Sequence, residues 1–290
     1  MYKIAILGCE NSHADSFVNY ILNSGKIDDI EIAGVYSDEE DACKRLSDNF
    51  GVYVAKSYDE FVGKIDGLVV TARHGANHYK YAKPYISSGI PMFIDKPITV
   101  CEDEAIEFMK ELKANNVRVT GGSCCVYDSY VQHIKSVVEG GRYGKVYGGF
   151  LRSPLSDLEQ YGGFFFYSQH LAQVMCEVFG YYPDSVQMFD KGEVKTLVTR
   201  YADYDVTGEF VTGNYLYYIG ASCEKDYVGD TYAIDASCFV VEFEEFNKLL
   251  HGGQMTQTYR EIIAPVFILN AMKRSLDSGK EEKITKIEEI

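Results

Sequence analysis

Several features that would mark a membrane, secreted or nucleic-acid-binding protein are missing from this sequence. No apolar run approaches the length of a membrane span, and the first residues, MYKIAILGCENSH, have too short an apolar stretch for a signal peptide. Positive charge is scarce, since 28 Lys and Arg face 43 Asp and Glu, and the net charge of -15 repels polyanions. We therefore expect a cytoplasmic protein with no nucleic-acid partner and no membrane partner.

Cysteine and histidine patterns typical of metal or disulfide sites are missing as well. The eight cysteines include no C-x-x-C pair, which argues against a zinc site and against a disulfide framework. The six histidines are dispersed, and the pair His74 and His78 has a glycine between its members and no third ligand nearby. We expect buried free thiols and no metal.

The first part of the chain alternates strand and helix patterns. Apolar residues make up 46% of the sequence, which is enough for a sizeable core in one large or two ordinary domains. Strands that are almost continuously apolar and are separated by helices indicate a parallel sheet covered on both faces. The expected strands are 3–7, 30–36, 67–71, 91–94 and 117–120, and the expected helices are 17–22, 42–50, 78–87 and 102–115. We predict a doubly wound Rossmann domain over residues 1–122.

The rhythm changes after about Gly122. Residues 131–138 have a helical pattern, several tyrosine- and valine-rich segments follow from 184 to about 241, and residues 259–275 form a last helical pattern. Runs of strands without intervening helices suggest a mostly antiparallel or mixed sheet. We predict a second domain of α+β type with a large open sheet over residues 123–290.

The turn after the first strand has one feature of a dinucleotide site. The strand runs into Gly8, but the usual G-x-G-x-x-G becomes GCENSH, so that Glu10 and His13 replace the later glycines. Asn11 and Ser12 can cap the next helix and donate to an anion, whereas Glu10 has the wrong charge for one. This pattern fits a dinucleotide site and an ordinary capped turn equally well.

An acidic cluster follows the second strand. Ser37 and Asp38 lie where a carboxylate can accept hydrogen bonds from an adenosine ribose and would repel a 2′-phosphate. The residues therefore favour NAD over NADP, although NADP stays possible. The same SDEED sequence also suits an acidic helix N-terminus, and spacing does not separate the two readings.

The block VVTARHGANHYKYAKPYISSGIPMFIDKPIT, which starts at Val69, is the most specific part of the sequence. It resembles the Gfo/Idh/MocA family of glucose-fructose oxidoreductase and inositol dehydrogenase-like proteins, in which a strand, a loop, a helical His and a second strand precede Glu-Lys-Pro. The matching residues here are the strand 67–71, the loop 72–77, His78, Ser88-Gly89 and Asp95-Lys96-Pro97. The resemblance continues through GGRYGKV at 140–146 and NAMKRSLDSGKEEKI near the end of the chain.

Lys96 is the expected centre of the chemistry. Ligands of doubly wound sheets bind outside the carboxyl ends of the strands, so Lys96 would face a nicotinamide and a substrate carbon. Hydride transfer from a C–H bond needs a partner for the hydroxyl proton, and a partly desolvated lysine suits that role. Pro97 would rigidify the chain behind it. The peptide bond between Lys96 and Pro97 could be cis or trans. A solvated lysine paired with Asp95 is the alternative.

A second catalytic element is implied by the resemblance. The family pattern G-G-G-x-x-x-D-x-x-x-H corresponds to YGGFFFYSQH, which supplies His170 but has Phe166 at the position of the Asp. A phenyl ring cannot relay a proton, so His170 would act with Tyr167 or the element would not serve catalysis. An ordinary helix histidine is the other interpretation of His170.

The resemblance completes the set of candidate site residues. The catalytic candidates are Lys96, His170 and Tyr167, and the substrate-binding candidates are Lys96, Tyr127, Arg152, Tyr161 and His170. The cofactor-binding candidates are Gly8, Glu10, Asn11, Ser12, His13, Ser37, Asp38, Thr71, Ala72, Arg73, His74, His78, Asp95 and Lys96. The 24 tyrosines could also build a homodimer or homotetramer interface on the second sheet, or could simply pack in the core.

The sequence therefore predicts an NAD(P)-dependent oxidoreductase, and the resemblance implies a sugar, inositol or related polyol as substrate. The later glycines missing after Gly8 and the aromatic residue at 166 also allow a non-catalytic sensor that keeps the fold. A hydrolase that uses bound NAD for transient oxidation is a third hypothesis.

Overall fold

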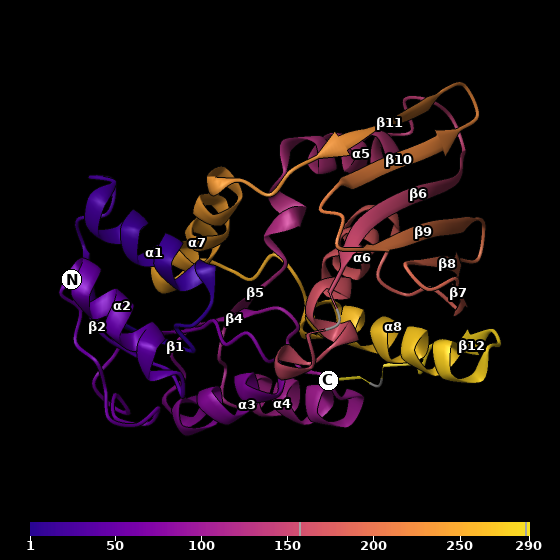
Figure 1. Ribbon diagram of the computed structural model, residues 1–290. Helices are drawn as coiled ribbons and strands as arrows, with labels where there is room; N and C mark the ends of the chain where they lie inside the picture. The colour runs from indigo at the N-terminus through magenta and orange to yellow at the C-terminus, as the bar shows by residue number, and fades with distance from the viewer. Residues whose placement is uncertain (157, 288) are drawn as a thin grey trace. The chain divides into compact units, whose positions relative to one another are not determined.

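The computed structural model describes residues 1–156, 158–287 and 289–290. They form two compact units, one made of residues 1–122 with 239–262 and 290, and the other of residues 123–238 with 263–289 (Figure 1). The cysteines are free, and all except Cys101 are buried. Among the described residues, no helix has both the length and the apolar character that crossing a membrane requires.

The first unit contains a five-stranded parallel sheet in the order β2-β1-β3-β4-β5. Its strands are β1 (Tyr2–Leu7), β2 (Ile30–Tyr36), β3 (Gly67–Val70), β4 (Met92–Asp95) and β5 (Val119–Gly122). The chain moves outward from β1 to β2 and then returns to β3 on the other side of β1. The carboxyl ends of β1 and β3 therefore flank the switch point at which doubly wound sheets bind ligands.

Helices cover both faces of this sheet, and β3, β4 and β5 are therefore buried along their whole length. The connections contain α1 (Ser12–Asn23), α2 (Glu40–Phe50), α3 (Ala76–Ala82), the 3-10 helix η1 (Lys83–Ser88) and α4 (Glu102–Ala114). One core cluster joins α1 and α2 to residues of β1, β3 and β4, while α3 and α4 run along the other side of the sheet (Figure 1). Gly51 ends α2 in the left-handed conformation, with φ 69°, which agrees with the end of the helix expected over 42–50.

A helix that the sequence reading missed completes the first core. α7 (Ala236–Leu250) begins where further strand-like sequence was expected. From Phe239 onward its apolar stripe packs into the first unit, where Phe243, Phe246 and Leu250 are buried in the core cluster. These residues count with the first unit, although the sequence assigned 123–290 to a single domain.

The second unit contains a seven-stranded sheet in the order β11-β10-β6-β9-β8-β7-β12. Its strands are β6 (Val146–Leu155), β7 (Ser185–Asp190), β8 (Val194–Arg200), β9 (Asp205–Thr212), β10 (Tyr217–Cys223), β11 (Tyr227–Tyr232) and β12 (Glu282–Lys283). Every pairing is antiparallel except β6 with β9. This confirms the predicted large, mostly antiparallel sheet.

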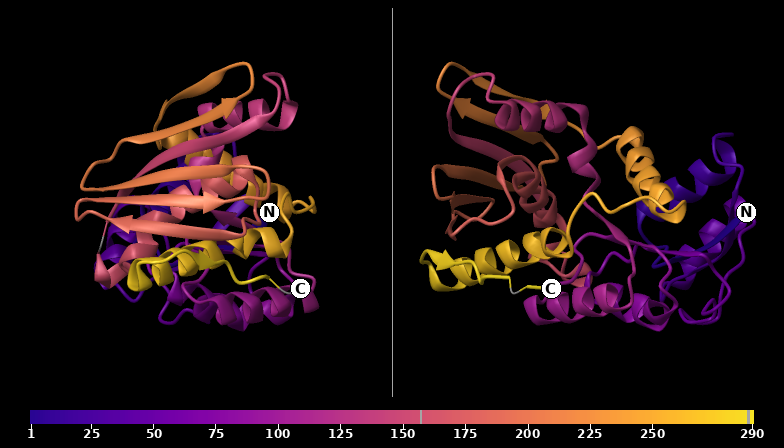
Figure 2. Two further views of the ribbon diagram at one scale, coloured as in Figure 1. Left: turned by 90° about the vertical axis from the view of Figure 1, so that its right-hand side faces the viewer. Right: turned by 180° about the vertical axis from the view of Figure 1, so that it is seen from behind.

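Helices pack on one face of the second sheet. They are α5 (Ser129–Gly140), α6 (Phe164–Phe179) and the part of α8 (Tyr259–Ser278) that follows residue 262, and short 3-10 helices η2 (Cys124–Tyr127) and η3 (Glu159–Tyr161) precede α5 and α6. Leu151 and Phe210 point to this face and are buried, whereas their neighbours Arg152 and Glu209 are only half-buried on the other. The left view of Figure 2 shows this other face of the sheet uncovered by helices.

We expect Phe246→Ala to lower the free energy of unfolding by about 3–5 kcal/mol, because truncating a buried phenylalanine leaves a cavity in the first core. Urea unfolding followed by circular dichroism measures the change. Val241→Ala is the matched control on the same helix, since Val241 is 41% exposed, and it should change stability by less than about 0.5 kcal/mol. Equal effects of the two substitutions would contradict the placement of α7 in this core.

Candidate functional site

Gly8 makes the turn between β1 and α1 possible. Its φ is +80°, and a Cβ at this position would lie 2.3 Å from the backbone nitrogen of Ala72. Its own nitrogen donates to the carbonyl of Tyr36 at 2.7 Å, and Thr71 Oγ1 donates to its carbonyl at 3.0 Å. The turn therefore joins the ends of β1, β2 and β3 through backbone that only glycine can supply.

Glu10 uses its charge within the protein. The buried carboxylate accepts a hydrogen bond from Ser37 Oγ at 2.6 Å and another from the backbone nitrogen of Arg73 at 2.9 Å. These bonds link the loops after β1, β2 and β3, so the structure brings three of the predicted cofactor-binding residues together. A carboxylate with two donors is better tolerated in a buried turn than an isolated one.

The sequence suggested that Asn11 caps the first helix. Its side chain makes no capping hydrogen bond to α1. Asn11 occupies the N-cap position, but its Nδ2 donates to Asp95 Oδ2 at 2.6 Å. The fully buried carboxylate of Asp95 offers a charged acceptor, and bonds to charged groups are stronger than neutral ones. Ser12 is exposed, and its hydroxyl donates to Asn11 Oδ1 at 3.3 Å.

His13 lies between two buried carboxylates of the first unit. Its Nδ1 is 3.3 Å from Asp95 Oδ2, and its Nε2 is 3.1 Å from Glu242 Oε2 on α7. The ring also meets Phe239 edge to face, with 4.7 Å between centroids. Burial raises the pKa of Asp95 to about 6, while the charges of His13 and Lys96 act in the opposite direction. The imidazole is thus a polar partner that the structure places between these two buried carboxylates.

Lys96 follows Asp95 at the end of β4 and is almost completely buried, with 4% of its surface exposed. Its backbone nitrogen donates to Asp95 Oδ1 at 2.6 Å. The peptide bond from Lys96 to Pro97 is cis, one of the two forms that the sequence left open. The alternative interpretation, a solvated lysine paired with Asp95, required the side chain to extend into bulk solvent. It does not do so.

His78 connects this segment to the loop after β3. Its Nδ1 lies 2.7 Å from the carbonyl oxygen of Pro97, and its Nε2 lies 2.7 Å from that of Ala72. Burial lowers the pKa of His78 to about 4, against the effect of these carbonyls, so the ring is neutral at physiological pH and donates to one of them. His74, also predicted as a cofactor residue, instead accepts at Nδ1 from the nitrogen of Ala76 at 3.2 Å.

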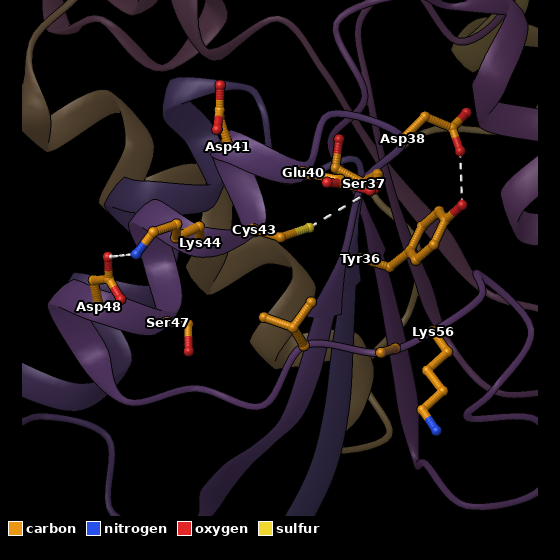
Figure 3. Close-up of a pocket in the computed structure, with 12 residues that line it drawn as sticks. Tyr36, Ser37, Asp38, Glu40, Asp41, Cys43, Lys44, Ser47, Asp48 and Lys56 are labelled. Carbon is orange, nitrogen blue, oxygen red and sulfur yellow. Dashed lines mark hydrogen bonds and ion pairs between the residues drawn. The ribbon is translucent and has the colours of Figure 1, made fainter.

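Asp38 lies at the rim of an open pocket of about 770 Å³ beside β2 and α2. Its carboxylate accepts from the hydroxyls of Tyr36 at 2.7 Å and Tyr81 at 2.8 Å, and the bond from Tyr36 is the largest effect that lowers the pKa of Asp38. Figure 3 shows the Tyr36 hydroxyl directed at Asp38 and the sulfur of Cys43 directed at Ser37. Asp38 is thus ionised and positioned, as a ribose acceptor must be.

His170 lies in the second unit, on α6, and is buried. Its Nδ1 is 2.7 Å from Ser123 Oγ and 3.4 Å from Cys125 Sγ. The ring of Tyr167 is 5.5 Å away, so the structure brings these two catalytic candidates together. Sequence reasoning missed Ser123 and Cys125, because they precede His170 by more than forty residues.

The remaining substrate-binding candidates of this unit are scattered. Tyr127 packs against the second core, and the ring of Tyr161 is 5.3 Å from that of Phe166. Arg152 lies on the sheet face opposite α6, where its Nε is 3.5 Å from Glu209 Oε2. The structure therefore does not group Arg152 with His170 within this unit.

Comparisons with known proteins match the first unit to one family. Residues 2–123 fit the model described as "Oxidoreductase family, NAD-binding Rossmann fold", GFO_IDH_MocA. A curated relative is the uncharacterized oxidoreductase YhhX of Escherichia coli K12, 24% identical over 143 residues, which are 49% of this chain and 41% of YhhX. The match thus spans less than half the length of that relative.

Solved structures share the fold of the whole chain. A scyllo-inositol dehydrogenase from Lactobacillus casei, with bound NAD(H) and scyllo-inositol, has a TM-score of 0.84 at 14% identity and covers 99% of this chain and 100% of its own. A putative myo-inositol dehydrogenase from Sinorhizobium meliloti 1021 has a TM-score of 0.83 at 16% identity. The match covers 98% of this chain and 100% of that protein's chain. These similarities confirm the predicted fold class.

We expect His78 to make folding less favourable in acid. Its folded pKa of about 4 lies below the ordinary 6.5, so its contribution is complete above pH 6.5 and is lost as the pH falls towards 4. The loss amounts to about 3 kcal/mol. Urea unfolding at several pH values should show this slope for the wild type and a weaker one for His78→Gln. The exposed His133→Gln is the control, and identical slopes for both variants would contradict the assignment.

His13→Leu should lower the free energy of unfolding at neutral pH by about 3–5 kcal/mol, because two carboxylates then stay buried without their imidazole. The double variant His13→Leu/Glu242→Leu should recover part of this loss, since one of those carboxylates is removed. Urea unfolding of both variants provides the comparison. A double variant no more stable than the single one would contradict the ion-pair explanation.

Proposed function

We propose that this chain transfers a hydride between NAD and a polyhydroxylated small molecule, because residues 2–123 match the model of an oxidoreductase family with an NAD-binding Rossmann fold. Sugars, inositols and related compounds are the proposed substrates. The observation that carries the proposal is the buried Lys96 beside Asp95 at the carboxyl end of β4. This is the edge of a doubly wound sheet at which ligands bind.

The residues of the first unit fit a dinucleotide. Gly8 allows close approach of backbone, and the ionised Asp38 can accept from ribose hydroxyls and disfavours a 2′-phosphate. The charge of Glu10, which would repel a pyrophosphate, is offset by hydrogen bonds from Ser37 and the Arg73 amide. Ser12 and Thr71 complete the proposed binding set. The bound nicotinamide would supply the hydride acceptor or donor.

Lys96 would handle the proton of the substrate hydroxyl at Nζ. Its side chain is almost completely buried beside Asp95, so a substrate bound at the end of β4 would meet the amine shielded from bulk water. His170 and Tyr167 would bind substrate oxygens. General acid–base assistance of this kind contributes roughly 10²- to 10⁴-fold to a rate.

A non-catalytic sensor is the second candidate function. It is favoured by Phe166, since α6 has no acidic residue in its first turn, and by Glu10 in the nucleotide-binding turn. Such a protein would bind the dinucleotide or a sugar without turnover. The two candidates differ in whether Lys96 matters for a measurable reaction.

We also propose a cytoplasmic location and a homodimer or homotetramer formed through the open face of the second sheet. Phe150, Tyr218 and Tyr227 gather on that face, where the hydroxyls of the two tyrosines are 3.2 Å apart. Phe189 adds a further aromatic side chain that is 43% exposed. Aromatic residues of this kind are enriched at the centres of protein interfaces.

We expect NAD to raise the melting temperature of the purified protein more than NADP, and a polyol or sugar to produce NADH absorbance. Lys96→Ala should keep NAD binding and lower kcat by about 10²-fold or more, because the proton loses its acceptor. Thermal shift and a screen of polyols and sugars measure the two effects. Lys64→Ala, an exposed lysine of the same unit, is the control and should behave like the wild type.

The outcomes separate the two candidates. Binding of NAD with no turnover on any compound, and no effect of Lys96→Ala, would favour the sensor. Failure to bind either dinucleotide would overturn both.

A further inference from the structure

Two polar side chains lie within 3.5 Å of one nitrogen of His170 inside the second unit, and a third holds one of them. Nδ1 is 2.7 Å from Ser123 Oγ and 3.4 Å from Cys125 Sγ, and Gln173 accepts from the Ser123 nitrogen at 2.7 Å. Ser123 and Cys125 are fully buried, and His170 is 4% exposed. The proposed reaction assigns no role to the serine or to the thiol.

Ser123 is fixed by backbone bonds on both sides of its hydroxyl. Its nitrogen donates to Gln173, and its Oγ accepts from the nitrogen of Cys125 at 3.2 Å. A serine hydroxyl has one proton and two acceptor positions, so it can donate to an unprotonated Nδ1 or accept from a protonated one. Ser123 therefore holds the ring of His170 in place in either protonation state.

The thiol of Cys125 can supply the proton that converts the unprotonated Nδ1 of His170 into the protonated one. Burial alone would raise the pKa of its thiol, but hydrogen bonds from Cys124, His170 and Ser123 and the charge of His170 hold that pKa well below its usual range. Transfer of the proton keeps the pair neutral overall, and a neutral pair costs less to bury than a single charge.

We propose that Ser123 and Cys125 are positioning residues that hold His170 as an imidazolium. The S–H bond of Cys125 breaks with its electron pair remaining on sulfur, and an N–H bond forms at Nδ1. The ring then carries a proton on each nitrogen, so Nε2 is a hydrogen-bond donor and not a base. The catalytic meaning of this assignment rests on the proposed function, where His170 would donate to a substrate oxygen and Lys96 would handle the proton.

The other titratable groups around the pair include Cys124, two buried tyrosines, Tyr167 and Asp128. Cys124 hydrogen-bonds to the Cys125 sulfur and is the largest effect that lowers the pKa of that thiol. Burial first, and the charge of Cys125 next, raise the pKa values of Tyr217 and Tyr232, so both phenols stay neutral. The Tyr167 ring lies 5.5 Å from the imidazole. Asp128, whose charge acts on Tyr232, accepts from the nitrogens of Tyr130 and Val131 at the start of α5.

The ultraviolet absorbance of thiolate, measured against pH on the intact protein, tests the proposal. At neutral pH the wild type should show one thiolate per chain more than Cys125→Ala, and His170→Gln should lose the same signal. Ser123→Ala should reduce it, since the thiolate loses a donor. The matched control is Cys176→Ala, another buried cysteine, whose pKa is raised by burial and which should leave the signal unchanged.

Nitrogen-15 spectra of the wild type and of His170→Gln, both labelled in histidine, give a second measurement. The wild type should show a ring that keeps protons on both nitrogens well above the ordinary histidine pKa and that is missing from His170→Gln, whereas the raised pKa of His251 affects both spectra alike. No excess thiolate over Cys125→Ala, retention of the thiolate signal in His170→Gln, or the same doubly protonated rings in both spectra would each overturn the pair.

These measurements need neither dinucleotide nor substrate. A missing thiolate therefore overturns the pair even if the protein oxidises a polyol. If the thiolate is present and no compound is turned over, the proposed function fails while the pair stands. If both hold, Cys125→Ala should shift the pH profile of kcat and leave the affinity for NAD unchanged, which a purely structural role would not do.

Discussion

The carboxylate of Asp95 sets the arrangement around the end of β4. It is completely buried, and a buried charge persists only with partners that satisfy it. Asn11 donates to it, His13 lies beside it, and the Lys96 backbone nitrogen closes the other oxygen. The cost of removing one carboxylate from water thus determines which side chains follow Gly8, and it fixes the segment that carries the candidate catalytic lysine.

This constraint also explains why the turn after β1 departs from the usual glycine pattern. Gly8 is retained because the backbone of Ala72 leaves no room for a Cβ. The positions of the later glycines carry Glu10 and His13, and both side chains are used within the protein, one on Ser37 and the other between Asp95 and Glu242. The departure is therefore compatible with a working nucleotide site, since neither charge is left facing a ligand uncompensated.

The sequence predicted the first sheet because its strands are almost purely apolar and end at recognisable turns, and the position of Lys96 followed from that sheet. It did not predict α7, although Phe239, Phe243, Phe246 and Leu250 recur at helical spacing, because β-rich sequence precedes them. The partners of buried polar groups, such as Asp95 for Asn11, depend on contacts between residues far apart in the chain. The face on which Arg152 lies could have been predicted, since its alternation with the buried Leu151 indicates the outer face of the sheet.

Phe166 has a different meaning once the surroundings of His170 are taken into account. A carboxylate at this position would orient an imidazole and balance its charge, and its loss suggests an inactive protein. In this chain Ser123 and Cys125 already lie within hydrogen-bond distance of the Nδ1 nitrogen, and in the proposed pair the Cys125 thiolate would supply the balancing charge. A second anion near the same ring would add repulsion, whereas Phe166 packs against Tyr161 and Tyr167 with ring centroids 5.3 and 5.1 Å away. An aromatic residue at 166 is therefore compatible with the proposed thiol–imidazole pair, so the sensor and the enzyme are separated by the turnover measurement and not by Phe166 alone.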